Sequence, residues 1–235
     1  MKYIISLLIL SMNLIAQDYY AKVEAVSQYN IKSAISGKVT LSNISKESTF
    51  VKDDLIIKID DKINKIELKQ TQNKIRNQKK ILNIQKQTLN SFNKVSSKSK
   101  FDKDKQKIVV LSTQIVLNDL QTKVYTLKDI IKNKNIRVKN LYINKIFVNK
   151  DDFVNPGTLL LRAYDLSKGK LIIFVNKNDI QNIKEKTILI DDKNVDVFIN
   201  KVYKTTDDKH LSSYKVELIL PKVELFSKLV KISIK

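Results

Sequence analysis

The sequence predicts an α+β multidomain protein, in which a long antiparallel α-helical coiled-coil hairpin is inserted in a split β-domain and a small β-barrel domain follows. Two segments in the first half of the chain repeat apolar residues at every seventh position, which predicts the hairpin. The segments on either side resemble each other and read as strands, which predicts the split β-domain. With three Gly and two Pro in 235 residues, long helices can run without interruption.

The first 16 residues are typical of a signal peptide. Lys2 gives a positive start, an apolar stretch follows, and Ala16 offers a small residue for cleavage. The apolar stretch holds about a dozen residues, fewer than the ~20 that a membrane-spanning helix needs. We therefore expect export and a mature chain that begins near Gln17, with cleavage favoured over an uncleaved anchor.

Composition argues against catalysis and against a bound cofactor or metal. The chain has no Cys, which excludes disulfides, thiol chemistry and Cys-ligated metals, and its one His, His210, would have to serve any Ser-His-Asp triad alone. The two Met, Met1 and Met12, lie in the predicted signal peptide, so the mature chain offers no soft ligands for copper or silver. Paired carboxylates in a plausible cleft and Gly-rich phosphate loops are missing from the sequence as well. We expect a non-enzymatic protein without cofactor.

The net charge of +20 permits nucleic acid, anionic lipid or an acidic protein surface as partner. Residues 62–134 hold 18 basic and 5 acidic residues, so most of the excess lies in the predicted hairpin. Export makes nucleic acid the least favoured of the three partners. We expect no nucleic acid.

The pattern of residues 62–132 predicts the helical hairpin. Its two series are Leu68, Ile75, Leu82 and Leu89, and then Val110, Leu117, Val124 and Ile131. The stripe is narrow, because the intervening positions of the first segment are mostly polar, so each helix needs one partner helix. A polar stretch rich in Ser and Lys at 93–105 predicts the turn between them. The alternative, two helices of an ordinary bundle, stays open at this point.

The flanking segments predict β-structure. Residues 17–61 and 133–168 each contain a hydrophobic residue, a tight turn and an apolar strand that ends at Asp, so we expect them to be the two halves of one β-domain. Residues 169–235 alternate apolar and polar positions in several short segments separated by turns, which predicts the β-barrel-like domain. Residues 20–26 fit a strand of either domain.

The two half-repeats resemble the biotinyl/lipoyl-like half-motifs of HlyD-type periplasmic adaptors, also called membrane fusion proteins, of tripartite RND-like efflux systems. The first half has Gly37-Lys38-Val39 followed by residues 47–56, and the second has residues 151–161 followed by Asp165-Leu166-Ser167. The order of signal peptide, half-motif, hairpin, half-motif and β-rich region matches that family over nearly the whole mature chain. This resemblance identifies residues 17–61 and 133–168 as a split lipoyl-like domain.

Three glycines of the family motif are replaced here, by Glu47, Asp53 and Asp151. A residue with a Cβ is disfavoured where φ is positive, although Asp tolerates that region better than most. We expect the turns at these places either to avoid positive φ or to hold an Asp in it.

The resemblance implies a non-catalytic adaptor subunit in the periplasm that is associated with the inner membrane and peripheral to it. Such a subunit links an inner-membrane transporter to an outer-membrane channel, and several copies form a homo-oligomeric ring. The family contacts the channel through the hairpin tip, with a motif spaced Arg-x3-Leu-x6-Ser. Matching positions here are Gln85, Leu89 and Ser96, with Lys86 beside Gln85 as a possible source of charge.

Two other functions compete with the adaptor. A lipoyl carrier would modify a Lys at a short turn, and Lys62 is near the matching place, but the helical insertion there is far longer than a carrier turn. A basic periplasmic coiled-coil protein that binds anionic lipid or cell-wall polymer is the stronger alternative. Salt-sensitive binding to liposomes, without a pump or channel that co-purifies, would favour that alternative.

Overall fold

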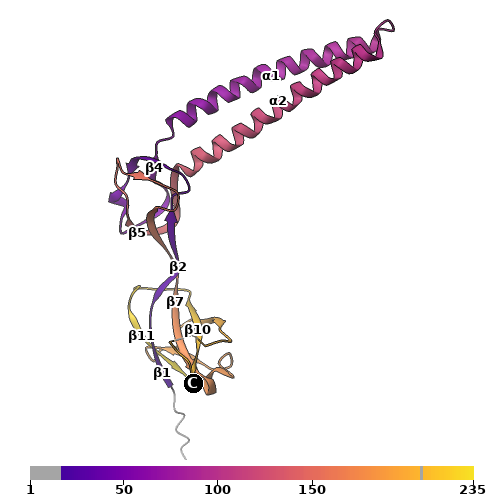
Figure 1. Ribbon diagram of the computed structural model, residues 1–235. Coiled ribbons are helices and arrows are strands. Elements are labelled where there is room, and N and C mark those ends of the chain that lie inside the picture. Colours follow the sequence, from indigo (N-terminus) through magenta and orange to yellow (C-terminus); the bar gives the residue numbers. More distant parts are fainter. Residues whose placement is uncertain (1–16, 207–208) are drawn as a thin grey trace, which may run out of the picture. The chain divides into compact units, whose positions relative to one another are not determined.

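We describe the protein from a computed structural model that covers residues 17–206 and 209–235 (Figure 1). The predicted signal peptide lies outside the described residues. The chain forms two compact units, which we name the hairpin unit, residues 30–163, and the terminal unit, residues 17–29 with 164–235. The chain passes from one unit to the other twice, within the strands β2 and β7, which pair with each other.

The hairpin unit contains a β-domain and two long helices. Its elements are the end of β2 (Glu24–Lys32), β3 (Gly37–Ser42), the 3-10 helix η1 (Ile44–Lys46), β4 (Thr49–Ile59), α1 (Lys62–Lys94), α2 (Lys100–Asn133), β5 (Asn135–Ile146), β6 (Phe153–Val154) and the start of β7 (Leu159–Asn176). The strand order is β6-β3-β4-β5-β7, with antiparallel pairing of β3 to β4, β3 to β6 and β4 to β5. The strand that precedes the helices thus pairs with the strand that follows them.

Direct hydrogen bonds join the two half-repeats. The Val39 N–H donates to the Asp152 carbonyl and the Asp151 N–H donates to the Val39 carbonyl, each at 2.8 Å. Apolar side chains from both halves form a single core: Val39, Val51, Ile56, Ile57, Ile59, Val138, Ile143, Ile146, Val148, Val154, Leu160, Leu161 and Ala163. The split halves therefore make one β-domain with a shared interior.

The turns use both of the solutions expected where glycines are replaced. Asp151 takes a positive φ of 75°, and its carboxylate lies 2.8 Å from the Lys38 Nζ. Glu47 keeps φ at −59° while the next residue, Ser48, takes φ of 58°. Asp53 lies within β4. The Glu47 side chain also accepts a hydrogen bond from the Ile146 N–H at 2.6 Å, which links the two halves again.

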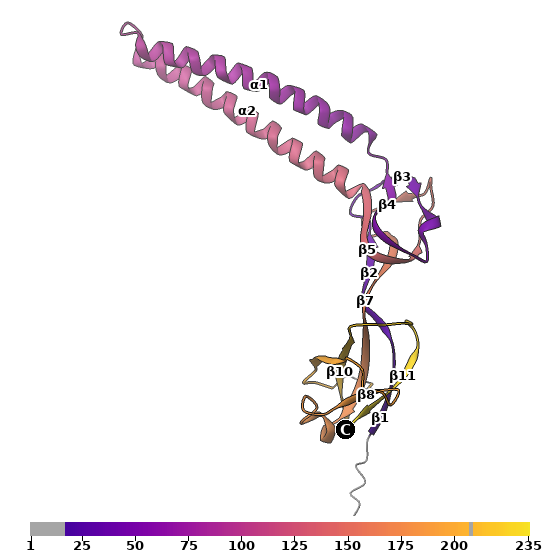
Figure 2. The same cartoon turned by 180° about the vertical axis from the view of Figure 1, so that it is seen from behind.

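The helices α1 and α2 run side by side in opposite directions (Figures 1 and 2). Residues 62–134 contain no Gly or Pro, so nothing in the backbone interrupts either helix. The α2 helix begins after Ser99, whose Oγ accepts a hydrogen bond from the Asp102 N–H at 3.1 Å, and this capping lets α2 start directly after the turn.

The terminal unit consists of strands from both ends of the described chain. Its elements are β1 (Gln17–Lys22), the start of β2, the end of β7, α3 (Lys177–Ile180), β8 (Ile188–Ile190), β9 (Phe198–Val202), β10 (Ser213–Leu220) and β11 (Leu229–Ile234). One sheet has the order β1-β11-β8, and β7, β10 and β9 follow one another in the other. Their buried side chains form the core of the unit: Ala21, Val23, Leu171, Ile173, Val175, Ile183, Ile188, Ile190, Val216, Leu218, Leu220, Val230, Ile232 and Ile234.

Two expectations for the terminal unit need correction. The predicted β-barrel is not closed in the described residues, because β8 and β9 each end their own sheet and do not pair with each other. The chain between them forms turns, with positive φ at Asp191 and Asp192, instead of a connecting strand. Residues 17–22, expected in the first lipoyl-like half, instead form β1 and pair with β11.

Candidate functional site: the hairpin and its root

The arms of the hairpin are long and nearly equal. The α1 helix has 33 residues and α2 has 34. At about 1.5 Å per residue, each arm extends for about 50 Å. A small turn, residues 95–99, connects the arms.

Side chains at the seven-residue positions face the partner helix. All eight residues of the two series are buried or half-buried, and so are the polar seam residues between them, among them Thr71, Gln78, Gln85 and Thr113. The Gln78 Nε2 donates to the Thr113 carbonyl at 3.2 Å, and the Lys123 Nζ lies 2.6 Å from the Glu67 Oε1. Polar contacts across an apolar seam fix which residues oppose one another.

The turn at the tip presents small and basic side chains. Ser96 is exposed, and Val95, the residue that follows α1, is 45% exposed. The Lys98 Nζ lies 4.5 Å from the ring centroid of Phe92, a cation–π contact that holds the turn against α1. The tip therefore offers a surface of mixed apolar and basic character.

The four residues predicted to contact a channel occupy two different environments. Lys86 and Ser96 are exposed. Leu89 is half-buried between the arms, and Gln85 accepts a 2.7 Å hydrogen bond from the Gln106 Nε2 of α2 at its Oε1. The structure thus makes Lys86 and Ser96 available at the surface, while Gln85 and Leu89 take part in the contact between the helices.

Sequence reasoning missed a row of apolar side chains on the outer face of α2. Phe101, Ile108 and Ile115 repeat at intervals of seven and are 74%, 65% and 59% exposed. Leu111 and Tyr125 are 54% and 73% exposed on the same helix. The sevenfold spacing was visible in the sequence, but it was hidden by the stronger neighbouring series that forms the seam.

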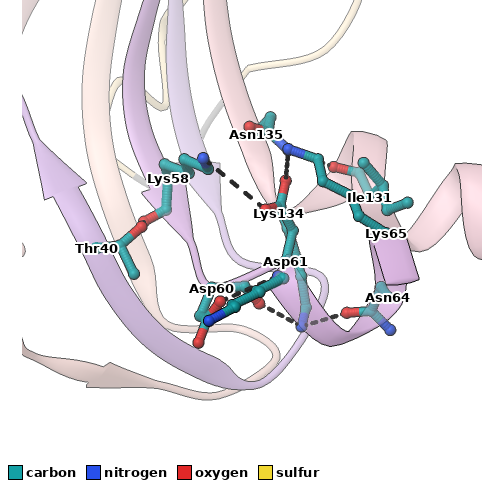
Figure 3. A network of polar contacts seen from close by, with 10 residues as sticks. Thr40, Lys58, Asp60, Asp61, Asn64, Lys65, Ile131, Lys134 and Asn135 are labelled. Carbon is teal, nitrogen blue, oxygen red and sulfur yellow. Dashed lines mark hydrogen bonds and ion pairs between the residues drawn. The ribbon is translucent and has the colours of Figure 1, made fainter. Parts of the chain in front are cut away.

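A polar network anchors both arms in the β-domain at what we call the hairpin root, residues 58–65 and 131–135 (Figure 3). The Lys134 Nζ donates to the Asp60 carbonyl at 2.7 Å and to the Asn64 Oδ1 at 2.8 Å. The Asn135 Nδ2 donates to the Asp61 Oδ2 at 2.9 Å and to the Ile131 carbonyl at 2.7 Å. The start of α1 is thereby tied to the end of α2.

Asp61 is the buried charge of this root. Its side chain is 4% exposed and lies 2.8 Å from the Lys65 Nζ and 3.8 Å from the Lys58 Nζ. Burial opposes ionisation, but hydrogen bonds from Asn135 and Lys65, together with the charge of Lys58, outweigh it, so the pKa of Asp61 lies below its ordinary value. Asp61 is therefore ionised at neutral pH and holds the two arms together.

The described residues give little support for other chemistry. Over residues 17–206 and 209–235, no group of three or more His, Cys, Asp or Glu side chains could hold a metal ion. The His210 ring stacks on Phe174 at 3.5 Å between centroids. In the same described part of the chain, no helix has the length and apolar character needed to cross a membrane.

A helical hairpin inserted in a split β-domain, with a second β-unit, is the fold of the membrane fusion proteins. The chain matches a MacA–MexA chimeric protein containing the α-hairpin domain of Pseudomonas aeruginosa MexA, with a TM-score of 0.67 and 18% identity over 94% of this chain and 80% of that chain. It matches a membrane fusion protein from Streptococcus pneumoniae with a TM-score of 0.68 and 7% identity, over 93% of this chain and 98% of that one.

A candidate efflux transporter from Bacteroides eggerthii matches with a TM-score of 0.67 and 14% identity, over 94% of this chain and 68% of that chain. No protein-family model matches the sequence, and no curated protein sequence matches it either. The resemblance to membrane fusion proteins that the sequence predicted is confirmed by these structural neighbours at the level of the fold.

Proposed function

We propose that this protein is a non-catalytic periplasmic adaptor of an efflux system, which links an inner-membrane transporter to an outer-membrane channel. The observation that carries the proposal is the pair of uninterrupted arms, 33 and 34 residues long, that leave a split β-domain and end in an exposed turn. Such a hairpin is suited to reach a partner far from the β-domain. The fold shared with membrane fusion proteins supports the same role.

In this proposal the parts of the chain have separate tasks. Residues 1–16 direct export, and the mature chain lies in the periplasm, peripheral to the inner membrane. The lipoyl-like halves within residues 17–61 and 133–168 hold the hairpin, and residues 169–235 face the transporter. The tip contacts the channel through Ser96 and Lys86, both exposed, while Leu89 and Gln85 support the tip from within the hairpin.

Several copies form a ring in this proposal, with neighbouring hairpins in contact. The exposed row of Phe101, Ile108 and Ile115 supports this arrangement, because apolar residues at every seventh position of a helix are typical of a helix–helix contact. The basic surface of the hairpins opposes self-association at low salt, and salt weakens that repulsion. We therefore expect the oligomer to be favoured as salt concentration rises.

Photo-cross-linking in cells tests the channel contact. A photoreactive amino acid at Ser96 should form a covalent product with an outer-membrane protein, which mass spectrometry identifies, and the same probe at the exposed Ser112 on α2 is the control. Products with lipid or cell-wall polymer at both positions would contradict the proposal.

The alternative function is binding of anionic lipid or cell-wall polymer by the basic hairpin. It predicts the opposite dependence on salt concentration from the one expected for the oligomer. Its binding would weaken as salt rises, because it depends on exposed charges. Flotation of the mature protein with phosphatidylglycerol vesicles at low and high salt, alongside its sedimentation behaviour at the same salt concentrations, separates the two functions.

A further inference from the structure

A groove lies open beside β9 in the terminal unit. Among the described residues, β9 pairs with β10 alone and ends its sheet. Two cavities of about 450 Å³ and 440 Å³ adjoin this strand and share Lys184 and Ile199 in their linings. Together they form what we name the β9 groove, between β9 and residues 180–188.

The floor of the β9 groove is apolar and continuous with the core of the unit. Ile183 and Ile188 are 2% and 8% exposed, and Ile199 and Val202 of β9 are half-buried against the same core. Phe198 at the start of β9 is 44% exposed at the edge of the groove. A segment lying along β9 would cover Phe198, Ile199 and Val202, which the unit by itself leaves partly open to water.

The backbone of β9 indicates the conformation of the ligand that the groove binds. A strand at the edge of a sheet presents N–H and C=O groups that another strand can pair with. The pairing of β9 with β10 shifts register between Glu217 and Leu218, and such bulges are frequent at sheet edges. An extended polypeptide is therefore a better match to the groove than a helix or a compact ligand.

Charge determines which polypeptide fits. Lys184 and Lys204 both line the larger cavity, and neither has an ion-pair partner in the described part of the chain. Lys186 pairs with Asp179 at 3.1 Å. Glu185 is the one acidic residue among the described residues that line the two cavities. A second copy of this chain is a poorer partner, because two molecules with a net charge of +20 repel each other.

We propose that the β9 groove binds an extended acidic segment of another protein by strand addition. Its main chain pairs with β9, alternate apolar side chains cover Ile199 and Val202, and carboxylates meet Lys184 and Lys204. This docking surface lies outside the hairpin, so the proposal can be tested independently of the proposed tip contact.

A labelled synthetic peptide of alternating valine and glutamate tests the proposal with the full mature chain. Fluorescence anisotropy measures its affinity, and amide hydrogen exchange locates the bound site. We expect slower exchange at residues 198–202 when the peptide is bound. A peptide of the same charge with proline in place of the central valines, which cannot donate the main-chain hydrogen bonds, should bind at least about tenfold more weakly.

Paired charge reversals distinguish the groove from general attraction to a basic protein. The double variant Lys184→Glu, Lys204→Glu should weaken binding roughly tenfold or more. The control, Lys128→Glu with Lys132→Glu, makes the same charge change at exposed positions of α2 and should leave binding nearly unchanged. Equal losses in both variants, equal binding of the proline peptide, or protection located outside 198–202 would each overturn the proposal.

Discussion

At the scale of single residues, Gly37 shows how tightly the two halves of the β-domain meet. Its φ is +156°, and a Cβ at this position would lie 2.6 Å from the Cγ2 atom of Ile59, which is fully buried. Gly37 is also paired with Val154 of the second half. A side chain here would therefore push against the core at the junction between the half-repeats.

We expect Gly37→Ala to lower the free energy of unfolding by about 1–3 kcal/mol, because overpacking adds to backbone strain. Chemical denaturation measures the loss. Ile59→Leu removes the opposing Cγ2 methyl, so Gly37→Ala should cost less in that background. If the two losses simply add, the clash with Ile59 is not the cause.

Asp61 carries a prediction about pH. Because its pKa in the folded protein is lowered, its ionised form stabilises the fold at pH values above the ordinary aspartate pKa of about 3.9, and this contribution is lost as the pH falls through the lower folded-state pKa. We expect Asp61→Asn to reduce stability by about 1–3 kcal/mol at pH 7. The difference from the parent should shrink at acidic pH.

Thermal unfolding of both proteins across the acidic range measures this difference. Asp104→Asn, at an exposed position of α2, is the matched control and should change stability little at any pH. A loss of stability by Asp61→Asn that stays the same at neutral and at strongly acidic pH would show that packing, not charge, explains its effect.

At the scale of elements, substitutions at different places in the hairpin should affect the stability of the protein and its contact with a partner differently. Ser96→Arg should change stability by less than about 0.5 kcal/mol, since the position is an exposed turn. It should nevertheless abolish efflux and cross-linking to the channel, because a tip contact is small. Leu89→Ala should reduce both stability and efflux, with a stability loss toward the low end of about 2–5 kcal/mol because Leu89 is only half-buried.

Ser112→Arg is the control for Ser96→Arg, because Ser112 is exposed on α2 but lies away from the turn. Efflux assays and cross-linking yield compare the variants, and denaturation checks that each is folded. Normal efflux and cross-linking with Ser96→Arg would mean that the channel is contacted elsewhere on the protein.

The elements also show where sequence reasoning succeeds and where it fails. The helices were predictable because the seven-residue series is local and unbroken, and every member of the two series is buried or half-buried. The pairing of β1 with β11 was not predictable from the sequence, because the two strands are far apart in the chain. The alternation at 20–26 also fits either β-unit. The contact of Gln85 with Gln106 was also hidden, because a polar seam residue looks like a surface residue until its partner is known.

At the scale of the whole molecule, the strand pairing and the core of the β-domain in the hairpin unit do not depend on most of the hairpin. The pairs β3–β6 and β4–β5 and the shared core all lie outside α1 and α2. In the root network, only one contact on the α1 side involves a residue after 64. It is the contact of Lys65 with Asp61. The helices therefore resemble an insertion in an otherwise complete domain.

We expect a chain that lacks residues 65–129, with the ends joined by a short turn, to keep a folded β-domain. Circular dichroism should lose most of its helical signal while denaturant unfolding remains cooperative, because the core residues are all retained. Loss of cooperative unfolding in the shortened chain would instead mean that the helices belong to the same core as the strands.

Matched arm lengths make the hairpin a molecular ruler. Because polar contacts such as Gln78 to Thr113 set the register, residues added to one arm alone would misalign every contact between the insertion and the turn. Evolution can lengthen the hairpin only by paired insertions, and a heptad in each arm moves the tip by about 10 Å. Under the proposed adaptor function, homologues that bridge gaps of different width should therefore differ by equal multiples of seven residues on both sides of the turn.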